Sequence, residues 1–135
     1  MQKAIMSKSI KVLIVEKRDL LREKIAGILS REKNITMVIQ VSSYSKLQTI
    51  LGETVPDLVI ADYFEFNKFC KEKCLVSGEL FPEANILLYT DEYGQLNRIE
   101  MGSIGDKKIF NVRRIQQEVS SFLRDAKQRK SGNKK

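Results

Sequence analysis

The stretch Pro56-Asp57-Leu58-Val59-Ile60-Ala61-Asp62 decides the fold of this 135-residue chain. Four apolar residues, Leu58 to Ala61, follow one another with no polar residue between them. Such a run is typical of a strand that is buried on both faces of a parallel sheet. The acidic residue Asp62 follows the run directly. Ligands and chemistry gather at the carboxyl ends of the strands in open parallel sheets, so Asp62 is a candidate site residue.

Further apolar runs occur on either side of this stretch, and segments with helical spacing separate them. The runs are Ile10–Val15, Ile35–Val41, Asn85–Thr90 and Lys107–Val112. Alternating strands and helices predict a single α/β domain with an open parallel sheet and right-handed crossovers. Only about a dozen residues, including Gly94, separate Thr90 from Gly102. We therefore expect the fourth helix to be short or irregular.

Composition bounds the class of protein. Apolar residues make up 42% of the chain and charged residues 30%, which is typical of one soluble globular domain. A membrane span needs about 20 consecutive apolar residues, and the longest uninterrupted runs here have four. We therefore expect no membrane insertion, no secretory signal and a cytoplasmic location. We expect an N-terminal extension over 1–9, a domain over 10–126 and a basic tail over 127–135.

The chain contains no histidine. This excludes Ser-His and Cys-His catalytic pairs, His-ligated zinc and a phosphohistidine carrier. The two cysteines, Cys70 and Cys74, are too few for a four-ligand metal site, and we expect them to be reduced thiols on one helix face.

Positive charge is concentrated at the C-terminus. From Arg124 to Lys135 there are six basic residues and one acidic residue, so this segment carries +5 of the net charge of +7. The simpler interpretation is a solvated helix end. The alternative is a nucleic-acid-associated regulator, in which the tail, Arg113 and Arg114 contact phosphates. The tail has no aromatic residue that would stack on bases.

Three stretches together resemble the receiver domain of two-component response regulators. They are Lys11-Val12-Leu13-Ile14-Val15-Glu16, followed by Arg22; Pro56 to Asp62; and Ile86-Leu87-Leu88-Tyr89-Thr90. The resemblance covers the chain from about Ile10 to Ala126. It implies a flavodoxin-like three-layer sandwich whose five-stranded parallel sheet has the order 2-1-3-4-5.

The resemblance also implies a site. Asp62 matches the phosphate-accepting aspartate, Thr90 the switch hydroxyl, and Lys108, or else Lys107, the phosphate-pairing lysine. Glu16, Asp62 and the backbone carbonyl of Phe64 would hold Mg²⁺. Simpler interpretations remain for three of them: Asp62 as a loop acid or helix cap, Thr90 as a helix cap, and Glu16 in a surface ion pair with Lys17, Arg18 or Lys108.

One departure from the family changes the predicted chemistry. The family has two adjacent acids after the first strand, whereas this chain has Glu16 and Lys17. A lysine there repels Mg²⁺, and it is expected to pair with Asp62 and replace the metal's charge. If Lys17 instead turns out to solvent, Glu16, Asp62 and the carbonyl of Phe64 would still hold Mg²⁺ weakly. The sequence therefore predicts a stand-alone receiver or pseudo-receiver in phosphorelay signalling, with weak or lost Mg²⁺ binding and no other cofactor.

The predicted partners follow from this reading. They are a histidine kinase or another signalling protein, or a second copy of the chain. No enzymatic activity is expected beyond phosphorylation and dephosphorylation of its own aspartate. A flavin or nucleotide enzyme on the same fold would need a phosphate-binding loop after the first strand, and Glu16-Lys17-Arg18-Asp19 does not provide one.

Overall fold

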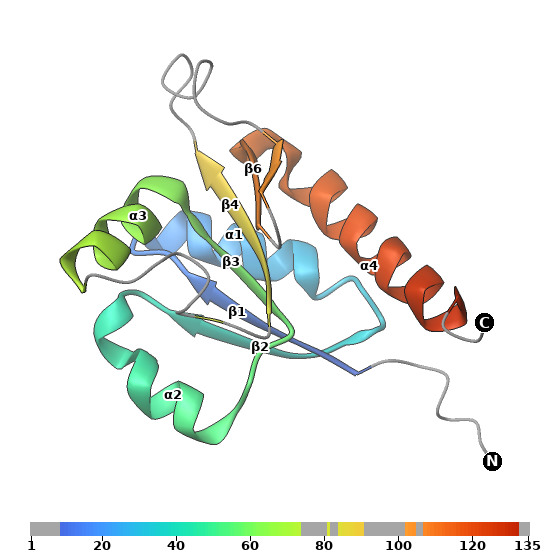
Figure 1. The fold of residues 1–135 in the computed structure, drawn as a ribbon, viewed down its shortest axis with the longest axis horizontal. Helices are drawn as coiled ribbons and strands as arrows, with labels where there is room; N and C mark the ends of the chain where they lie inside the picture. The colour runs from blue at the N-terminus through green and yellow to red at the C-terminus, as the bar shows by residue number, and fades with distance from the viewer. Residues whose placement is uncertain (1–8, 74–80, 82–83, 91–101, 105–106, 133–135) are drawn as a thin grey trace.

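The structure, a computed structural model, describes residues 9–73, 81, 84–90, 102–104 and 107–132. Strands and helices alternate along most of the chain (Figure 1). In chain order they are β1 (Ile10–Val15), α1 (Asp19–Leu29), β2 (Ile35–Val41), the 3-10 helix η2 (Tyr44–Lys46), α2 (Leu47–Glu53), β3 (Leu58–Asp62), α3 (Tyr63–Glu72), β4 (Asn85–Thr90), β5 (Gly102–Ile104), β6 (Lys107–Asn111), the 3-10 helix η3 (Val112–Arg114) and α4 (Ile115–Gly132).

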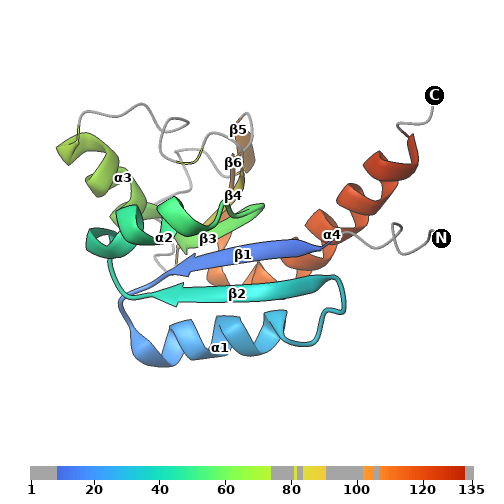
Figure 2. The same ribbon diagram turned by 90° about the horizontal axis from the view of Figure 1, so that it is seen from below.

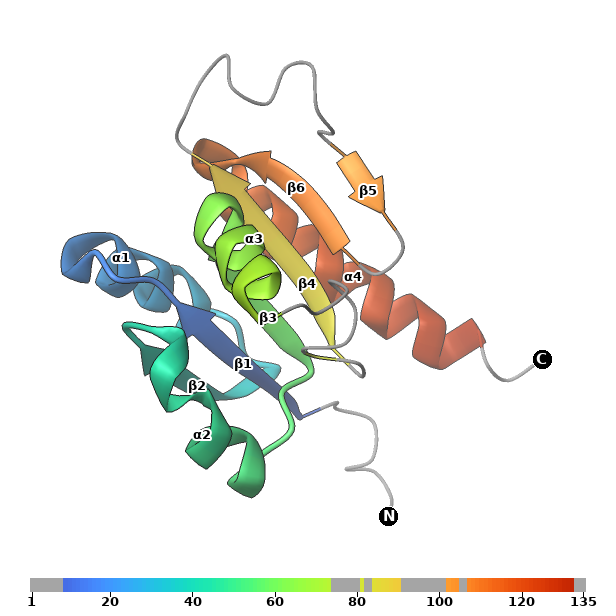
Figure 3. The ribbon, with the colours of Figure 1, turned by 60° about the vertical axis from the view of Figure 1, so that its left-hand side comes forward.

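The sheet has the order β2-β1-β3-β4-β6-β5. The first five strands in this sheet order, β2, β1, β3, β4 and β6, are parallel to one another. This confirms the predicted order 2-1-3-4-5, with β6 as the fifth parallel strand. The short strand β5 is antiparallel and extends the sheet beyond β6 (Figure 3). Three residues are too few to give a recognisable pattern, so the sequence did not predict β5. The segment 91–101, where a short fourth helix was predicted, lies outside the described residues.

Two apolar clusters cover the two faces of the sheet. One contains α1 and α4 side chains such as Ile25, Leu29 and Val119. The other contains α2 and α3 side chains such as Leu47 and Phe66. Figure 2 shows α1 on one side of β1 and β2, with α2 and α3 on the other. The result is the predicted three-layer sandwich, in which strand side chains alternate between two buried faces.

Strand register brings the candidate residues to one edge of the sheet. Val15 pairs with Ala61, so the next residues, Glu16 and Asp62, lie at the same level. Asp62 in turn pairs with Tyr89 of β4. At the other end of the chain, α4 continues to Gly132, so the predicted tail begins inside a helix. The division at 126 stays a prediction.

Candidate functional site

Asp62 ends β3 and caps α3. Its Oδ2 accepts a hydrogen bond of 3.0 Å from the backbone N–H of Glu65. An acidic side chain at this position satisfies an otherwise unpaired helix N–H and interacts favourably with the helix dipole. Asp62 is therefore both the last residue of β3 and the N-cap of α3, so the helix-cap interpretation is correct. Its side chain is 12% exposed.

The start of α3 corrects the prediction for Phe64. The helix begins at Tyr63, immediately after Asp62, so Phe64 lies in its first turn. Backbone carbonyls in a helix point towards its C-terminal end. The carbonyl of Phe64 therefore points away from Asp62 and is not placed to share a metal with it. A loop after β3 was assumed, whereas the capping bond to Glu65 allows the helix to begin at once.

Glu16 is buried, and both of its carboxylate oxygens accept hydrogen bonds from neighbouring residues. Its Oε2 accepts from the backbone N–H of Arg18 at 2.8 Å and from Nε of the same residue at 2.7 Å. Its Oε1 accepts from Nη2 of Arg18 at 3.1 Å and from the hydroxyl of Tyr89. Burial opposes the charged form, but the hydrogen bonds from Arg18 and Tyr89 outweigh it and lower the pKa of Glu16.

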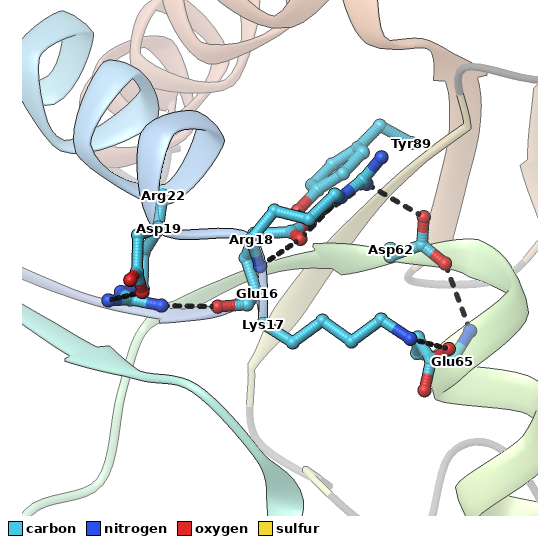
Figure 4. Close-up of polar contacts among 8 residues, drawn as sticks. All are labelled: Glu16, Lys17, Arg18, Asp19, Arg22, Asp62, Glu65 and Tyr89. Carbon is cyan, nitrogen blue, oxygen red and sulfur yellow. Dashed lines mark hydrogen bonds and ion pairs between the residues drawn. The ribbon is translucent and has the colours of Figure 1, made fainter.

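Arg18 places a guanidinium between the two carboxylates (Figure 4). Besides its contacts to Glu16, its Nη2 lies 3.5 Å from Oδ1 of Asp62. That distance is long for a hydrogen bond, so the contact is mainly electrostatic. Burial, followed by the nearby charge of Glu16, nevertheless raises the pKa of Asp62, against the lowering effects of the Glu65 N–H and Arg18.

Arg22 fixes the loop that carries these groups. Its Nη1 donates to the backbone carbonyl of Glu16 at 2.7 Å, and its Nη2 contacts Oδ1 of Asp19 at 2.7 Å. The loop after β1 is therefore held from α1 while Arg18 reaches across to β3. Arg22 was part of the sequence resemblance, and the structure gives it this positioning contact.

The structure places Lys17 differently from the prediction. Its Nζ lies 3.2 Å from Oε2 of Glu65, and the lysine side chain is 64% exposed. Successive side chains alternate in direction along extended backbone. Because Glu16 turns into the site, Lys17 turns away towards α3, and the next residue, Arg18, supplies the cation. The predicted cation next to Asp62 is present, but it belongs to Arg18.

Mg²⁺ prefers an octahedron of oxygen ligands, and the residues present do not fit it. Both oxygens of Glu16 accept hydrogen bonds from Arg18 or Tyr89, and a guanidinium faces Asp62. No group of three acidic or cysteine side chains with metal-binding geometry occurs in the described part of the chain. The predicted ligand set of Glu16, Asp62 and Phe64 is therefore not assembled.

Lys108 also lies away from Asp62. Lys108 pairs with Leu87 in the sheet, two residues before the strand position that is level with Asp62. Its Nζ forms an ion pair of 2.8 Å with Oε1 of the buried Glu118 in α4. The prediction that Lys108 pairs with a phosphate at Asp62 is corrected by this register, which brings Asn111 to the carboxyl end of β6. Asn111 caps η3 by accepting from the N–H of Arg113 at 2.9 Å.

Thr90 is the last residue of β4 and is buried. It pairs with Asn111 and lies one residue beyond the partner of Asp62. Its position at the carboxyl edge is the one predicted, and its switch role stays a prediction.

A cavity of about 450 Å³ opens beside the site, on the α3 side. It is lined by Lys17, Asp62 and Glu65, by Tyr44 at the start of η2 and by Phe69 of α3. The rings of Tyr44 and Phe69 are stacked with centroids 4.6 Å apart. The cavity carries both charge signs, so its lining favours no single class of ligand.

The alternative function rests on basic residues that the structure describes only in part. Arg113 and Arg114 are exposed on η3, and Arg114 lies 3.4 Å from Glu118. Side chains after Asp125 lie outside the described residues. The nucleic-acid alternative therefore stays a prediction. Within the residues described, no helix has the length and apolar character needed to cross a bilayer.

Comparisons with known proteins support the fold. Neither a protein-family model nor a curated protein sequence matches this chain. Among solved structures, it is similar to the signal receiver domain described as that of the response regulator NarL from Mycobacterium tuberculosis, with 13% identity, a TM-score of 0.60, and coverage of 90% of this chain and 98% of that one. It is also similar to a response regulator receiver modulated diguanylate cyclase from Pelobacter carbinolicus, with 21% identity, a TM-score of 0.55, and coverage of 91% and 98%.

A third similar structure is the lysine decarboxylase LdcF from Francisella novicida, with 16% identity and a TM-score of 0.51. That match covers 87% of this chain but only 17% of the decarboxylase chain. At these identities the likeness shows the fold alone. The chain has the fold of response-regulator receiver domains, as its sequence predicts.

The sequence does not predict the contacts of two residues of the site. Arg18 is predicted only as one of three possible surface partners of Glu16, whereas the structure buries this carboxylate and brings Arg18 to Asp62 as well. Tyr89 is predicted only as part of a strand, because its hydroxyl contact with Glu16 depends on the pairing of β1, β3 and β4. An arginine two residues after a buried acid is the signal that was available for the first of them.

Proposed function

We propose that this chain is a receiver-type signalling domain that acts through protein contacts without Mg²⁺ or phosphorylation of Asp62. The observation that carries the proposal is the guanidinium of Arg18, which contacts both Glu16 and Asp62. In this reading the pseudo-receiver takes part in a phosphorelay pathway by binding a kinase or another signalling protein, and it performs no catalysis of its own.

The permanent charge of Arg18 supports a single fixed arrangement of Glu16 and Asp62. Two carboxylates at one strand edge repel each other unless a cation lies between them. An arginine is always charged and is tied to the chain, whereas a bound metal ion exchanges with solvent. Arg18 therefore supplies permanent compensation. It also connects the loop after β1 to the end of β3, which favours a single arrangement of this edge.

The contacts of Asp62 argue against transfer of a phosphoryl group to it. Such a transfer needs a free carboxylate oxygen and cations that can bind the phosphoryl oxygens. One oxygen of Asp62 caps α3, and the other faces a guanidinium that is already bound to Glu16. Lys108 and Lys17, the other predicted cations, are paired with Glu118 and Glu65.

The test is intact-mass measurement of the full chain after incubation with Mg²⁺ and a small acyl-phosphate donor. We expect no mass gain, with circular dichroism reporting an unchanged fold. A gain of one phosphoryl group that is absent in Asp62→Asn would overturn the proposal. A gain that persists in Asp62→Asn would mark modification at another residue, and would leave Asp62 unmodified as proposed.

A further inference from the structure

The strand β2 forms one edge of the sheet, and β1 is its only strand partner in the part of the chain that the structure describes. Figure 2 shows β2 along the near side of the sheet, between α1 and α2. An edge strand presents a row of backbone N–H and C=O groups that can pair with another strand. The other edge belongs to the short strand β5, which is antiparallel to its neighbour.

The sequence of β2 lacks the usual protection of an edge. Its residues are Ile-Thr-Met-Val-Ile-Gln-Val, and no charged residue or proline occurs from Ile35 to Ser45. Natural edge strands are commonly blocked by lysine, proline or a bulge. The pairing of β1 with β2 is irregular only at the start, where Ile10 pairs with Ile35 and Lys11 with Met37. The segment Met37–Val41 is regular, and Met37 is 42% exposed.

Backbone direction along this segment follows from one hydrogen bond. The carbonyl of Val41 accepts from the N–H of Glu16 at 3.1 Å, so it points inward towards β1. Neighbouring residues in a strand direct their backbone groups to opposite sides. Val38 and Gln40 therefore direct their N–H and C=O groups outward, away from the sheet.

We propose that two copies of this chain pair through β2, antiparallel, with Ile39 of one copy opposite Ile39 of the other. This register places Val38 opposite Gln40 of the second copy, and both residues have outward backbone groups. Antiparallel hydrogen-bonded pairs exchange two bonds each, so the contact would contain about four inter-chain backbone bonds. The interface is isologous, as a two-fold axis requires.

The side chains of β2 and the charge of the chain are compatible with a second copy at this edge. In this register Met37 lies beside Val41 of the second copy, next to the central pair of Ile39 side chains. Ile39 and Val41 belong to the α2/α3 face of the sheet, so the pairing joins two apolar rows into one. Each copy has a net charge of +7, and an uncharged edge is where two such molecules can approach with least repulsion.

A cysteine placed at the two-fold axis tests the register. Residues opposite each other in a non-hydrogen-bonded antiparallel pair have Cα atoms about 4.5 Å apart, which is within the range of a disulfide. In a Cys70→Ala/Cys74→Ala background, Ile39→Cys should give a covalent dimer under mild oxidation. Met37→Cys is the matched control, because the two copies of residue 37 lie four residues out of register. Both variants should retain the circular dichroism of the parent.

Sedimentation of the full chain over a range of concentrations tests the pairing without any cross-link. We expect a monomer–dimer equilibrium that Met37→Lys and Gln40→Pro both shift to monomer. Proline is tolerated at an edge position whose N–H points outward, so Gln40→Pro should fold. Gln116→Lys, on an exposed position of α4, should keep the dimer.

Three outcomes would overturn the proposal. They are a monomer at every concentration with no cross-link in Ile39→Cys, equal cross-linking by Met37→Cys, and a dimer that persists in both Met37→Lys and Gln40→Pro.

Discussion

The hydroxyl of Tyr89 donates a hydrogen bond to the carboxylate of Glu16, which joins the end of β4 to the end of β1 across β3. Both side chains are buried, and burial, followed by the contact with Glu16, raises the pKa of Tyr89. The tyrosine therefore stays protonated and remains a donor at any physiological pH. Because Arg18 also donates to this carboxylate, both oxygens of the buried Glu16 have hydrogen-bond donors.

Tyr89→Phe tests the stabilising effect of this contact. The substitution removes one donor from a buried carboxylate and leaves the ring in place. We expect the free energy of unfolding to fall by about 1–3 kcal/mol, the usual cost of leaving a buried polar group short of a partner. Urea denaturation at neutral pH measures this.

The chain offers a matched control in Tyr44→Phe. The hydroxyl of Tyr44 is buried and has no hydrogen-bond partner among the described residues. Its removal should leave stability unchanged or slightly higher. Equal losses in the two variants would show that the Tyr89 hydroxyl has no special role.

Glu16→Gln should alter the acid limb of stability. The pKa of Glu16 is lowered in the folded state relative to its ordinary value of 4.5. Its contribution is therefore present above about that pH and is lost as the pH falls through the lowered folded pKa. We expect the variant to be less stable than the parent at neutral pH and to depend less on pH below 4.5. Urea midpoints across an acid series report this, and parallel curves would contradict it.

Asp62→Asn should have an effect on stability at neutral pH opposite in sign to that of Glu16→Gln. Because the folded state raises the pKa of Asp62 above its ordinary 3.8, the charged carboxylate is disfavoured there at neutral pH. Asparagine removes that charge and is still a good N-cap for α3. We expect the melting temperature at neutral pH to be equal to that of the parent or higher. Asp62→Ala removes the cap as well and should lower stability by about 1 kcal/mol relative to Asp62→Asn. A strong loss in Asp62→Asn would mean that its contact with Arg18 outweighs burial.

The fold was predictable because strand runs and helical spacing are local patterns. Leu58 to Ala61 carry no polar residue, and the register that follows from such strands brought Glu16 and Asp62 together as expected. The strand β5 has only three residues, so its pairing with β6 depends on contacts distant in sequence. Local patterns do not contain that information.

The candidate site was predictable in position but not in contacts. The end of β3 was identified correctly, yet which of Lys17 and Arg18 would face Asp62 depends on how the loop turns after β1. The same limit applies to Lys108, whose side-chain direction follows from its level in β6. The family resemblance matches Lys108 to a lysine at the carboxyl edge, whereas pairing with Leu87 sets it two positions back.

Lys108→Ala should therefore affect α4 and not the neighbourhood of Asp62. The lysine forms an ion pair with Glu118, whose side chain is only 6% exposed. Its removal leaves the buried carboxylate with the longer contact to Arg114. We expect a loss of about 1–3 kcal/mol in unfolding free energy, with amide NMR shifts confined to α4 and β6. Shifts centred on Asp62 and Glu65 would instead support the original phosphate-pairing position of Lys108.

Lys17→Asp combined with Arg18→Ala should create Mg²⁺ binding that we expect the parent to lack. The first substitution restores the family's second acid, and the second removes the guanidinium from Glu16 and Asp62. Freed carboxylates at one strand edge are ligands that Mg²⁺ accepts. We expect saturable amide shifts around Asp62 in the millimolar range of Mg²⁺ for the double variant. The parent and Arg113→Ala, which removes an exposed arginine elsewhere, should show no such shifts. Binding by the parent would mean that Arg18 does not exclude the ion. No binding by the double variant would mean that the early start of α3 at Tyr63, with the Phe64 carbonyl turned away, is by itself enough to prevent it.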